Sequence, residues 1–349
     1  MKKIAYIELD THAEIALNFM ELIQDSKAFS VDYYFSEKIL RFFGFAQNDK
    51  LPENIKKATP ENLIQQLSTD NYQLIIIGTV HRYFNVFEEV AEKFNTSIIC
   101  HNLNFVKASN FDLLSSVFKE DFQFRLKLLL KEGLLRKSKV YEKAKNLLVL
   151  DRGFDSAQPD KYKFLPIFYT KFLEKPKNET YTIVIPGAVS QKRRDYEKVL
   201  KSIIKFHFPF EIIFLGKASG KELEMLQDFE QSKPENISIK YFKEKVPQDV
   251  FDDYMQKADV LWCSIQQETE FFSQKEIYGI TKMSGNIGDA VKFGKLAVFP
   301  EDYPSKYSFI IPEKGSLGDF LFTKKDVDFS EFSKEKVLQE LEKTIFALL

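Results

Sequence analysis

Two series of short apolar runs, in which longer amphipathic stretches separate one run from the next, constrain the fold of this chain more than any other feature. Short apolar runs that alternate with stretches of helical periodicity are typical of βα units, which build mostly parallel sheets. Two series therefore predict two α/β domains. The expected strands are Ile4–Leu9, Val31–Phe35, Leu74–Ile77, Ser97–Cys100 and Asn146–Leu150 in the first series, and Tyr181–Ile185, Glu211–Leu215, Ile237–Phe242, Val260–Cys263 and Leu296–Phe299 in the second.

The length of the chain and the break between the two series set the expected domain boundaries. At 349 residues the chain exceeds the size at which a single hydrophobic core usually stops growing. From Asp151 to Thr180 the pattern gives way to Gly, Pro, Lys and Asp, which predicts an interdomain linker. We therefore expect one domain over residues 1–170 and a second over 171–330. Apolar residues at helical spacing within 331–349 predict a last helix that packs back toward the first domain.

Composition excludes several classes of protein. The net charge of −1 argues against nucleic acid as a partner. The two cysteines each lie inside an apolar run, so neither a disulfide framework nor a cysteine metal site is expected. Glu8, Asp10 and His12 interrupt the apolar start before it reaches the length of a signal sequence, and no run of 18 apolar residues follows. We expect a cytoplasmic protein.

The first candidate binding element is the segment 186–194, Pro-Gly-Ala-Val-Ser-Gln-Lys-Arg-Arg, which joins an expected strand to an expected helix. Ligands of open parallel sheets bind at the carboxyl ends of the strands. Gly187 allows a close approach of the backbone, and Arg193 and Arg194 offer guanidinium groups beside helix-terminal N–H groups, a combination that suits phosphate. The alternative is that both arginines are solvated surface charges, although a cationic pair at a helix N-terminus opposes the helix dipole.

The second candidate element is the glycine-rich segment 278–289, which leads into another expected helix. Ser284, Gly285 and Asn286 form a loop whose N–H groups can face a diphosphate, and Lys282 adds positive charge. The spacing matches neither the dinucleotide fingerprint nor a P-loop. The alternative is an ordinary turn, because Gly and Asn favour turns for conformational reasons alone.

The order of these segments resembles the C-terminal domain of GT-B glycosyltransferases, particularly the retaining members of glycosyltransferase family 4. The resemblance covers roughly residues 180–300. It implies two Rossmann-like domains that face each other across a cleft, with Asp289 on the nucleotide ribose and Arg193 or Arg194 on the diphosphate. Two positions depart from the family pattern: Thr281 replaces the usual upstream glutamate, and an aspartate stands where family members have glutamate at 289.

Histidines at strand ends are the candidates for catalysis in the first domain. His101 directly follows an expected strand, which resembles the family's short strand that ends in a cleft-facing histidine. His12 follows the first strand, and a neutral imidazole at either position can hydrogen-bond a sugar hydroxyl. The alternative is a structural hydrogen bond. We give His81 less weight than His12, and we expect His207 to be structural.

These features together predict a glycosyltransferase that moves a hexose-type residue from a UDP- or GDP-type nucleotide-sugar to a glycan or lipid-linked acceptor, as in surface polysaccharide synthesis. The only Asp-x-Asp motif, Asp326–Asp328, lies in a polar stretch away from strand ends, so we expect neither a metal nor a cofactor. Retention of anomeric configuration, which the resemblance implies, needs no general base on the protein. The alternatives are an epimerase-like or phosphorylase-like enzyme, a non-catalytic binding module, and a two-lobed periplasmic binding protein, which the absence of an export signal disfavours.

A basic, leucine-rich segment bears on partners. Residues 125–145 contain eight Lys or Arg and two Glu, interleaved with leucines. Such a segment can lie on an anionic membrane, where lipid-linked acceptors are found, which predicts peripheral contact at the inner face of the membrane. The alternative is that the leucines face the protein core and the lysines face solvent.

Overall fold

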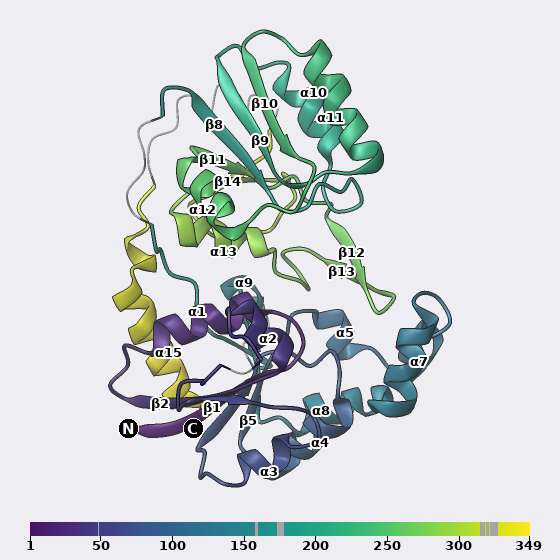
Figure 1. The fold of residues 1–349 in the computed structure, drawn as a ribbon, viewed down its shortest axis with the longest axis vertical. Helices are drawn as coiled ribbons and strands as arrows, with labels where there is room; N and C mark the ends of the chain where they lie inside the picture. The colour runs from purple at the N-terminus through teal and green to yellow at the C-terminus, as the bar shows by residue number, and fades with distance from the viewer. Residues whose placement is uncertain (48, 158–159, 173–177, 315–317, 319–320, 322–326) are drawn as a thin grey trace. The chain divides into compact units, whose positions relative to one another are not determined.

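The computed structural model describes residues 1–47, 49–157, 160–172, 178–314, 318, 321 and 327–349, and it divides the chain into two compact units (Figure 1). Unit 1 consists of Met1–Ile167, Glu270–Met283 and Lys334–Leu349. Unit 2 consists of Phe168–Thr269 and Ser284–Ser333. The chain therefore passes between the units four times, at 167/168, 269/270, 283/284 and 333/334.

Unit 1 is built on a seven-stranded parallel sheet in the order β3-β2-β1-β4-β5-β6-β7. The central strands are almost entirely apolar because helices cover parallel sheets on both faces, and Ile4–Ile7 and Leu74–Ile77 have no exposed surface. The strands are β1 (Lys2–Glu8), β2 (Phe29–Phe35), β3 (Ile55–Lys57), β4 (Leu74–Ile77), β5 (Thr96–Ile99), β6 (Asn146–Val149) and β7 (Tyr162–Phe164).

Helices connect the strands of unit 1, and the last helix of the chain belongs to the same unit. The hydroxyl of Ser26 donates to Glu342, and Lys334 pairs with Asp25, so the final helix is held beside the first. No helix among the described residues is long and apolar enough to cross a membrane. The helices are α1 (Ala13–Ile23), α2 (Glu37–Phe42), α3 (Leu63–Leu67), α4 (Phe84–Lys93), α5 (Leu103–Lys107), α6 (Asn110–Ser116), α7 (Phe122–Lys131), α8 (Lys137–Lys143), α9 (Arg152–Ala157) and α15 (Lys334–Leu348).

Unit 2 has a six-stranded parallel sheet in the order β10-β9-β8-β11-β14-β15. Its core gathers aromatic side chains around the fully buried Trp262, whose ring stacks on Phe206. The strands are β8 (Tyr181–Pro186), β9 (Phe210–Lys217), β10 (Ile237–Phe242), β11 (Val260–Trp262), β14 (Leu296–Phe299) and β15 (Ile310–Pro312), and the helices are α10 (Tyr196–Ile203), α11 (Gly220–Ser232), α12 (Gln248–Lys257) and α13 (Gly285–Phe293).

A two-stranded hairpin, β12 (Glu268–Phe271) and β13 (Gln274–Ile277), interrupts the second series. The expected domain 171–330 included this segment, whereas the structure assigns residues 270–283 to unit 1. The physical reason is that Phe271 and Phe272 pack against Phe105 of unit 1, with ring centroids 5.0 and 5.1 Å away. We call residues 270–283 the inserted arm.

Candidate active site

Three histidines of unit 1 lie together where β1, β4 and β5 end. The rings of His12 and His101 stack with centroids 3.9 Å apart. His81 lies 5.9 Å from His12 and 6.0 Å from His101, edge-on to both. The sequence analysis singled out His12 and His101 and gave His81 less weight, whereas the structure makes all three members of one cluster. The carboxyl edge of a parallel sheet explains this, because loops that follow adjacent strands converge there.

Hydrogen-bond partners determine where His101 carries its proton. His101 Nε2 lies 2.8 Å from the carbonyl oxygen of Gly78, and a carbonyl only accepts, so Nε2 carries the hydrogen. Burial lowers the pKa of His101 well below its usual value, and the nearby His12 and His81 lower it further. His101 is therefore neutral, and its Nδ1 has a lone pair that can accept a hydrogen bond.

A short chain of hydrogen bonds fixes His81 in the same way. Lys282 Nζ donates to Asn102 Oδ1 over 2.8 Å, so the amide nitrogen of Asn102 is turned toward His81 Nε2, 3.4 Å away. Because an amide nitrogen only donates, His81 Nε2 accepts and the proton resides on Nδ1. Burial, together with the charges of His12 and Lys282, lowers the pKa of His81. The cluster thus presents an acceptor on His101 and a donor on His81.

Glu8, at the end of β1, supports the loops behind the cluster. One carboxylate oxygen accepts from the backbone N–H groups of Asp10 and Thr11, at 3.0 and 3.2 Å, and the other accepts from the hydroxyl of Thr79 at 2.7 Å. The side chain is fully buried, and burial raises its pKa to about 7, against the opposing effect of the Thr79 hydrogen bond. Glu8 therefore ties the loop that leads to His12 to the loop that leads to His81.

In unit 2 the two predicted binding segments meet. Arg194 Nη2 donates to Asn286 Oδ1 over 3.2 Å, and Asn286 Nδ2 donates to Asp289 Oδ2 over 3.2 Å. We call these three residues the arginine network. Burial raises the pKa of Asp289 to about 6, although Asn286, Lys292 and Arg194 all lower it. Among the described residues, the buried Nε of Arg194 has no hydrogen-bond partner. Arg193, by contrast, is exposed.

Two glycines hold the loop after β8 close to the arginine network. Gly187 has a φ of 102°, and a Cβ there would lie 2.8 Å from Arg194 Nη2. A Cβ on Gly216, in the neighbouring strand β9, would lie 2.2 Å from the carbonyl oxygen of Gly187. Larger side chains at either position would push the loop away from Arg194.

The start of α13 supplies backbone donors beside the network. Ser284 caps the helix, with its hydroxyl accepting from the N–H of Asn286 at 3.3 Å, and Gly285 is exposed with open space around it. The N–H groups of Asn286 and Ile287 bond to Ser284, and the start of this nine-residue helix carries a partial positive charge that attracts anions. Lys282 was predicted to share this loop, but it lies in the inserted arm of unit 1, bound to Asn102.

The described residues contain no group of three His, Cys, Asp or Glu side chains able to hold a metal ion. Of the Asp-x-Asp motif, Asp326 lies outside the described residues, and the Asp328 carboxylate accepts from the backbone and hydroxyl of Ser330.

The sequence analysis missed Glu8 and Asn102. Glu8 stands inside an apolar run, where a carboxylate is unusual unless it is hydrogen-bonded, and that position was the available signal. Asn102 directly follows His101 at a strand end, so the rule that singled out the histidine applies to it as well.

No protein-family model matches this chain, and no curated protein matches its sequence. Solved structures do match, over essentially the whole chain. A lipopolysaccharide outer core galactosyltransferase, WaaB, has 13% identity and a TM-score of 0.57, covering 99% of this chain and 100% of its own. HepE of Anabaena, solved with UDP and glucose, has 10% identity and a TM-score of 0.58, with the same coverage.

An enzyme of another class shares the fold. The UDP-GlcNAc 2-epimerase of Neisseria meningitidis, solved with UDP-GlcNAc, has 11% identity and a TM-score of 0.53, covering 99% of this chain and 100% of its own. At these identities the similarity concerns the fold. The two parallel-sheet units, both spanned by the matches, give this chain the GT-B fold.

Proposed function

We propose that this chain is a glycosyltransferase that takes a hexose from a nucleoside diphosphate sugar. The observation that carries the proposal is the arginine network at the carboxyl edge of the unit 2 sheet, where a guanidinium, an amide and a carboxylate are linked beside a helix N-terminus. A guanidinium and the positive start of a helix suit a diphosphate, and a carboxylate suits the two hydroxyls of a ribose.

The chemistry of the donor follows from this arrangement. The bond between sugar C1 and the β-phosphate oxygen breaks, a bond forms between C1 and the acceptor oxygen, and the acceptor hydroxyl passes its proton to the departing phosphate oxygen. The diphosphate gains negative charge as it leaves, and Arg194 together with the N–H groups at the start of α13 offsets that charge without a metal. The resemblance to family 4 favours retention of configuration.

The histidine cluster is assigned to sugar hydroxyls. His101 Nδ1 accepts a hydrogen bond from a hydroxyl, and His81 Nδ1 donates one. The accepting role of His101 requires a neutral imidazole, which its lowered pKa provides. His12 stacks on His101 and so restricts the orientation of its ring.

We also propose which nucleotide the sugar donor carries and which class of acceptor receives the sugar. We favour uridine over guanosine because HepE and the Neisseria epimerase, which share the fold, were solved with uridine nucleotides. A glycan or lipid-linked acceptor of surface polysaccharide synthesis fits an enzyme that resembles WaaB in fold.

Nucleotide binding tests the donor site directly. We expect UDP at about 100 times its dissociation constant to stabilise the protein by about 2.7 kcal/mol, measured as a thermal shift, with GDP weaker. Arg194→Ala and Asp289→Asn should each reduce the shift, and Arg193→Ala combined with Arg194→Ala should abolish it. Exposed Lys192→Ala, two residues from Arg194, is the matched control. An unchanged shift in the double variant would rule out the phosphate role of the arginines.

Turnover separates the transferase from the epimerase-like alternative that the fold also allows. A transferase releases UDP from a UDP-sugar when an acceptor is present, whereas an epimerase converts one UDP-sugar into another and releases none.

His101→Ala should lower kcat strongly and leave the UDP thermal shift unchanged. Equal turnover in this variant would instead indicate a structural role for the histidine.

A further inference from the structure

Part of the segment predicted to meet a membrane, residues 125–145, is buried in the core of unit 1. Leu128, Leu134 and Val140 have no exposed surface. Arg125 is buried and donates to the carbonyl of Ser116. Fully buried Lys137 donates to three backbone carbonyls. Leu128 and Leu134 thus match the core-facing alternative, whereas Leu130, Lys127 and Lys131 are exposed.

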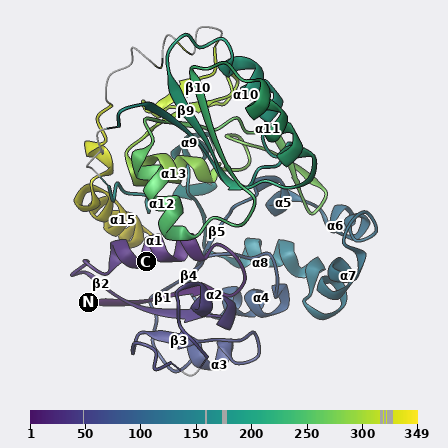
Figure 2. The same ribbon diagram turned by 45° about the horizontal axis from the view of Figure 1, so that its top comes forward.

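Large apolar side chains are exposed in α6, in the turn that follows it and in α7. Phe111 is 79% exposed, Phe118 72% and Leu130 73%, and Leu114 and Phe122 are also exposed. Phe111 and Leu114 lie three positions apart in α6 and so share one face, and Phe118 lies in the turn that follows, with its ring centroid 5.9 Å from that of Phe122. We call these five residues the α6–α7 apolar surface. Figure 2 shows α6 and α7 beside each other at the edge of unit 1.

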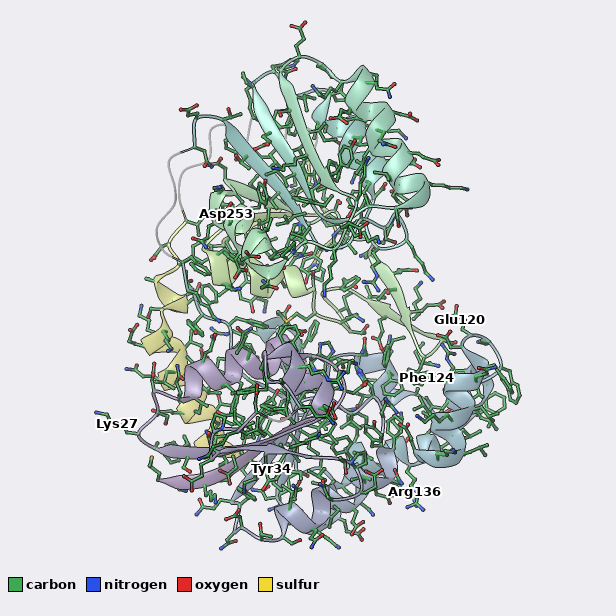
Figure 3. All side chains as sticks on the ribbon, in the orientation of Figure 1. Lys27, Tyr34, Glu120, Phe124, Arg136 and Asp253 are labelled. Carbon is green, nitrogen blue, oxygen red and sulfur yellow. The ribbon has the colours of Figure 1, made fainter. Side chains whose placement is uncertain are left out.

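The charges around this surface favour an anionic partner. Lys107, Lys119, Lys127 and Lys131 are exposed, against the exposed acids Glu120 and Asp121. Residues 107–136 hold six Lys or Arg and four Asp or Glu, a net charge of +2 in a chain whose total is −1. Glu120 is partly offset because its carboxylate lies 3.5 Å from Arg125. Figure 3 labels Glu120 and Phe124 in this region.

The types of side chain favour a bilayer over a protein. Protein interfaces concentrate Trp, Tyr and Arg, whereas residues 111–130 contain no Trp or Tyr and a single Arg, which is buried. Protruding Phe and Leu with flanking Lys match the interfacial mode, in which rings enter the acyl boundary and ammonium groups remain at the headgroups. We propose that the α6–α7 apolar surface docks this protein on the anionic face of a lipid bilayer.

Vesicle co-sedimentation of the full chain, without nucleotide, tests the proposal. The probes are vesicles of phosphatidylglycerol mixed with phosphatidylcholine and vesicles of phosphatidylcholine alone. We expect binding to the mixed vesicles that weakens as salt rises. Phe111→Ser combined with Phe118→Ser should weaken this binding at least about tenfold, since two exposed rings lose their burial in the membrane. Lys119→Gln combined with Lys127→Gln should weaken it on the mixed vesicles alone.

The matched control is Phe42→Ser, because Phe42 is exposed in α2, outside this surface. It should bind vesicles as the wild type does. Melting temperatures close to that of the wild type show that each variant is folded. Absence of binding to mixed vesicles, or equal binding by the Phe111/Phe118 variant, overturns the proposal, as does a change of oligomeric state in that variant without vesicle binding. Thermal shifts with UDP do not depend on whether the protein binds vesicles. The proposed nucleotide-sugar site is therefore tested separately from the proposed membrane surface.

Discussion

At the scale of the residue, Glu8 makes the stability of unit 1 depend on pH. The pKa of its buried carboxyl is about 7, above the usual value of a glutamate. The folded protein therefore keeps a proton that the unfolded chain has released between about pH 4.5 and pH 7. The free energy of unfolding should fall as pH rises through this window and then level off, by up to about 3 kcal/mol for this group.

Glu8→Gln removes this dependence while keeping a similar shape. The amide oxygen can accept from Asp10 and Thr11, and the amide nitrogen can donate to Thr79. We expect the variant to match the wild type near pH 5 and to be more stable by about 1 to 3 kcal/mol at pH 8, as measured by denaturant unfolding at both values. Exposed Glu53→Gln is the control and should leave the pH profile unchanged. A variant less stable than the wild type at pH 8 would contradict this account.

Residues at strand ends were predictable one by one, but their partners were not. Arg194, Asn286 and Asp289 stand out in the sequence because each lies in a loop or helix start that follows a strand. The separation of Lys282 from Ser284 leaves no local signal, because both belong to one polar, glycine-rich stretch. This separation depends on contacts of the inserted arm with residues far earlier in the chain, such as the bond from Leu103 N to the Thr281 carbonyl.

At the scale of the element, α5 is held at both ends by buried charges. Glu276 of the inserted arm accepts from the N–H groups of Asn104 and Phe105, at 3.3 and 2.8 Å. Lys137 of α8 donates to the carbonyls of Phe105, Val106 and Ala108 at 2.6 to 2.9 Å. A helix of five residues has no stability of its own, so these charges at its ends fix it. Because α5 begins directly after Asn102, they also position the histidine cluster.

Lys137→Met tests this arrangement. Methionine keeps most of the buried apolar volume but leaves three carbonyls without their donor. We expect a loss of about 3 kcal/mol in the free energy of unfolding. Lys139→Met, on the exposed side of the same helix, should change stability by less than about 0.5 kcal/mol. A loss of similar size in both variants would show that the effect belongs to the helix and not to the carbonyl contacts.

Continuous apolar runs made the central strands predictable, whereas several short or polar elements were not predicted. All ten expected runs coincide with strands. Strands β3, β7 and β15 have three residues each, too few for a period to show, and β12 and β13 each consist of three polar residues and one apolar residue, a composition that also suits a loop. The expected linker 151–180 contains α9 and β7. These two short elements were not predicted because the prolines of the segment indicated a loop.

At the scale of the whole molecule, the chain order and the spatial units disagree. Unit 1 is completed only by the inserted arm and α15, both of which follow residues of unit 2 in sequence. The arm contributes Phe271 and Phe272 to the packing around Phe105, and α15 buries Val337, Leu341 and Ile345. Neither contribution is available to the N-terminal half alone.

A fragment of residues 1–167 should therefore fold poorly. We expect it to melt well below the full chain, or without a cooperative transition, in thermal unfolding followed by circular dichroism. Its exposed apolar surface should also promote aggregation. Adding residues 334–349 through a flexible linker should recover part of the stability. A fragment that melts cooperatively at the temperature of the full chain would show that the arm and the last helix contribute little.

The position of the inserted arm also governs how hybrid enzymes from this fold can be made. An exchange of everything after residue 170 for the corresponding half of another protein with the GT-B fold would bring a foreign hairpin against α5 and a foreign residue against Asn102. Hybrids intended to change what unit 2 binds should therefore keep residues 270–283 and α15 from the same parent as the N-terminal half, and exchange only the stretches of unit 2 on either side of the inserted arm.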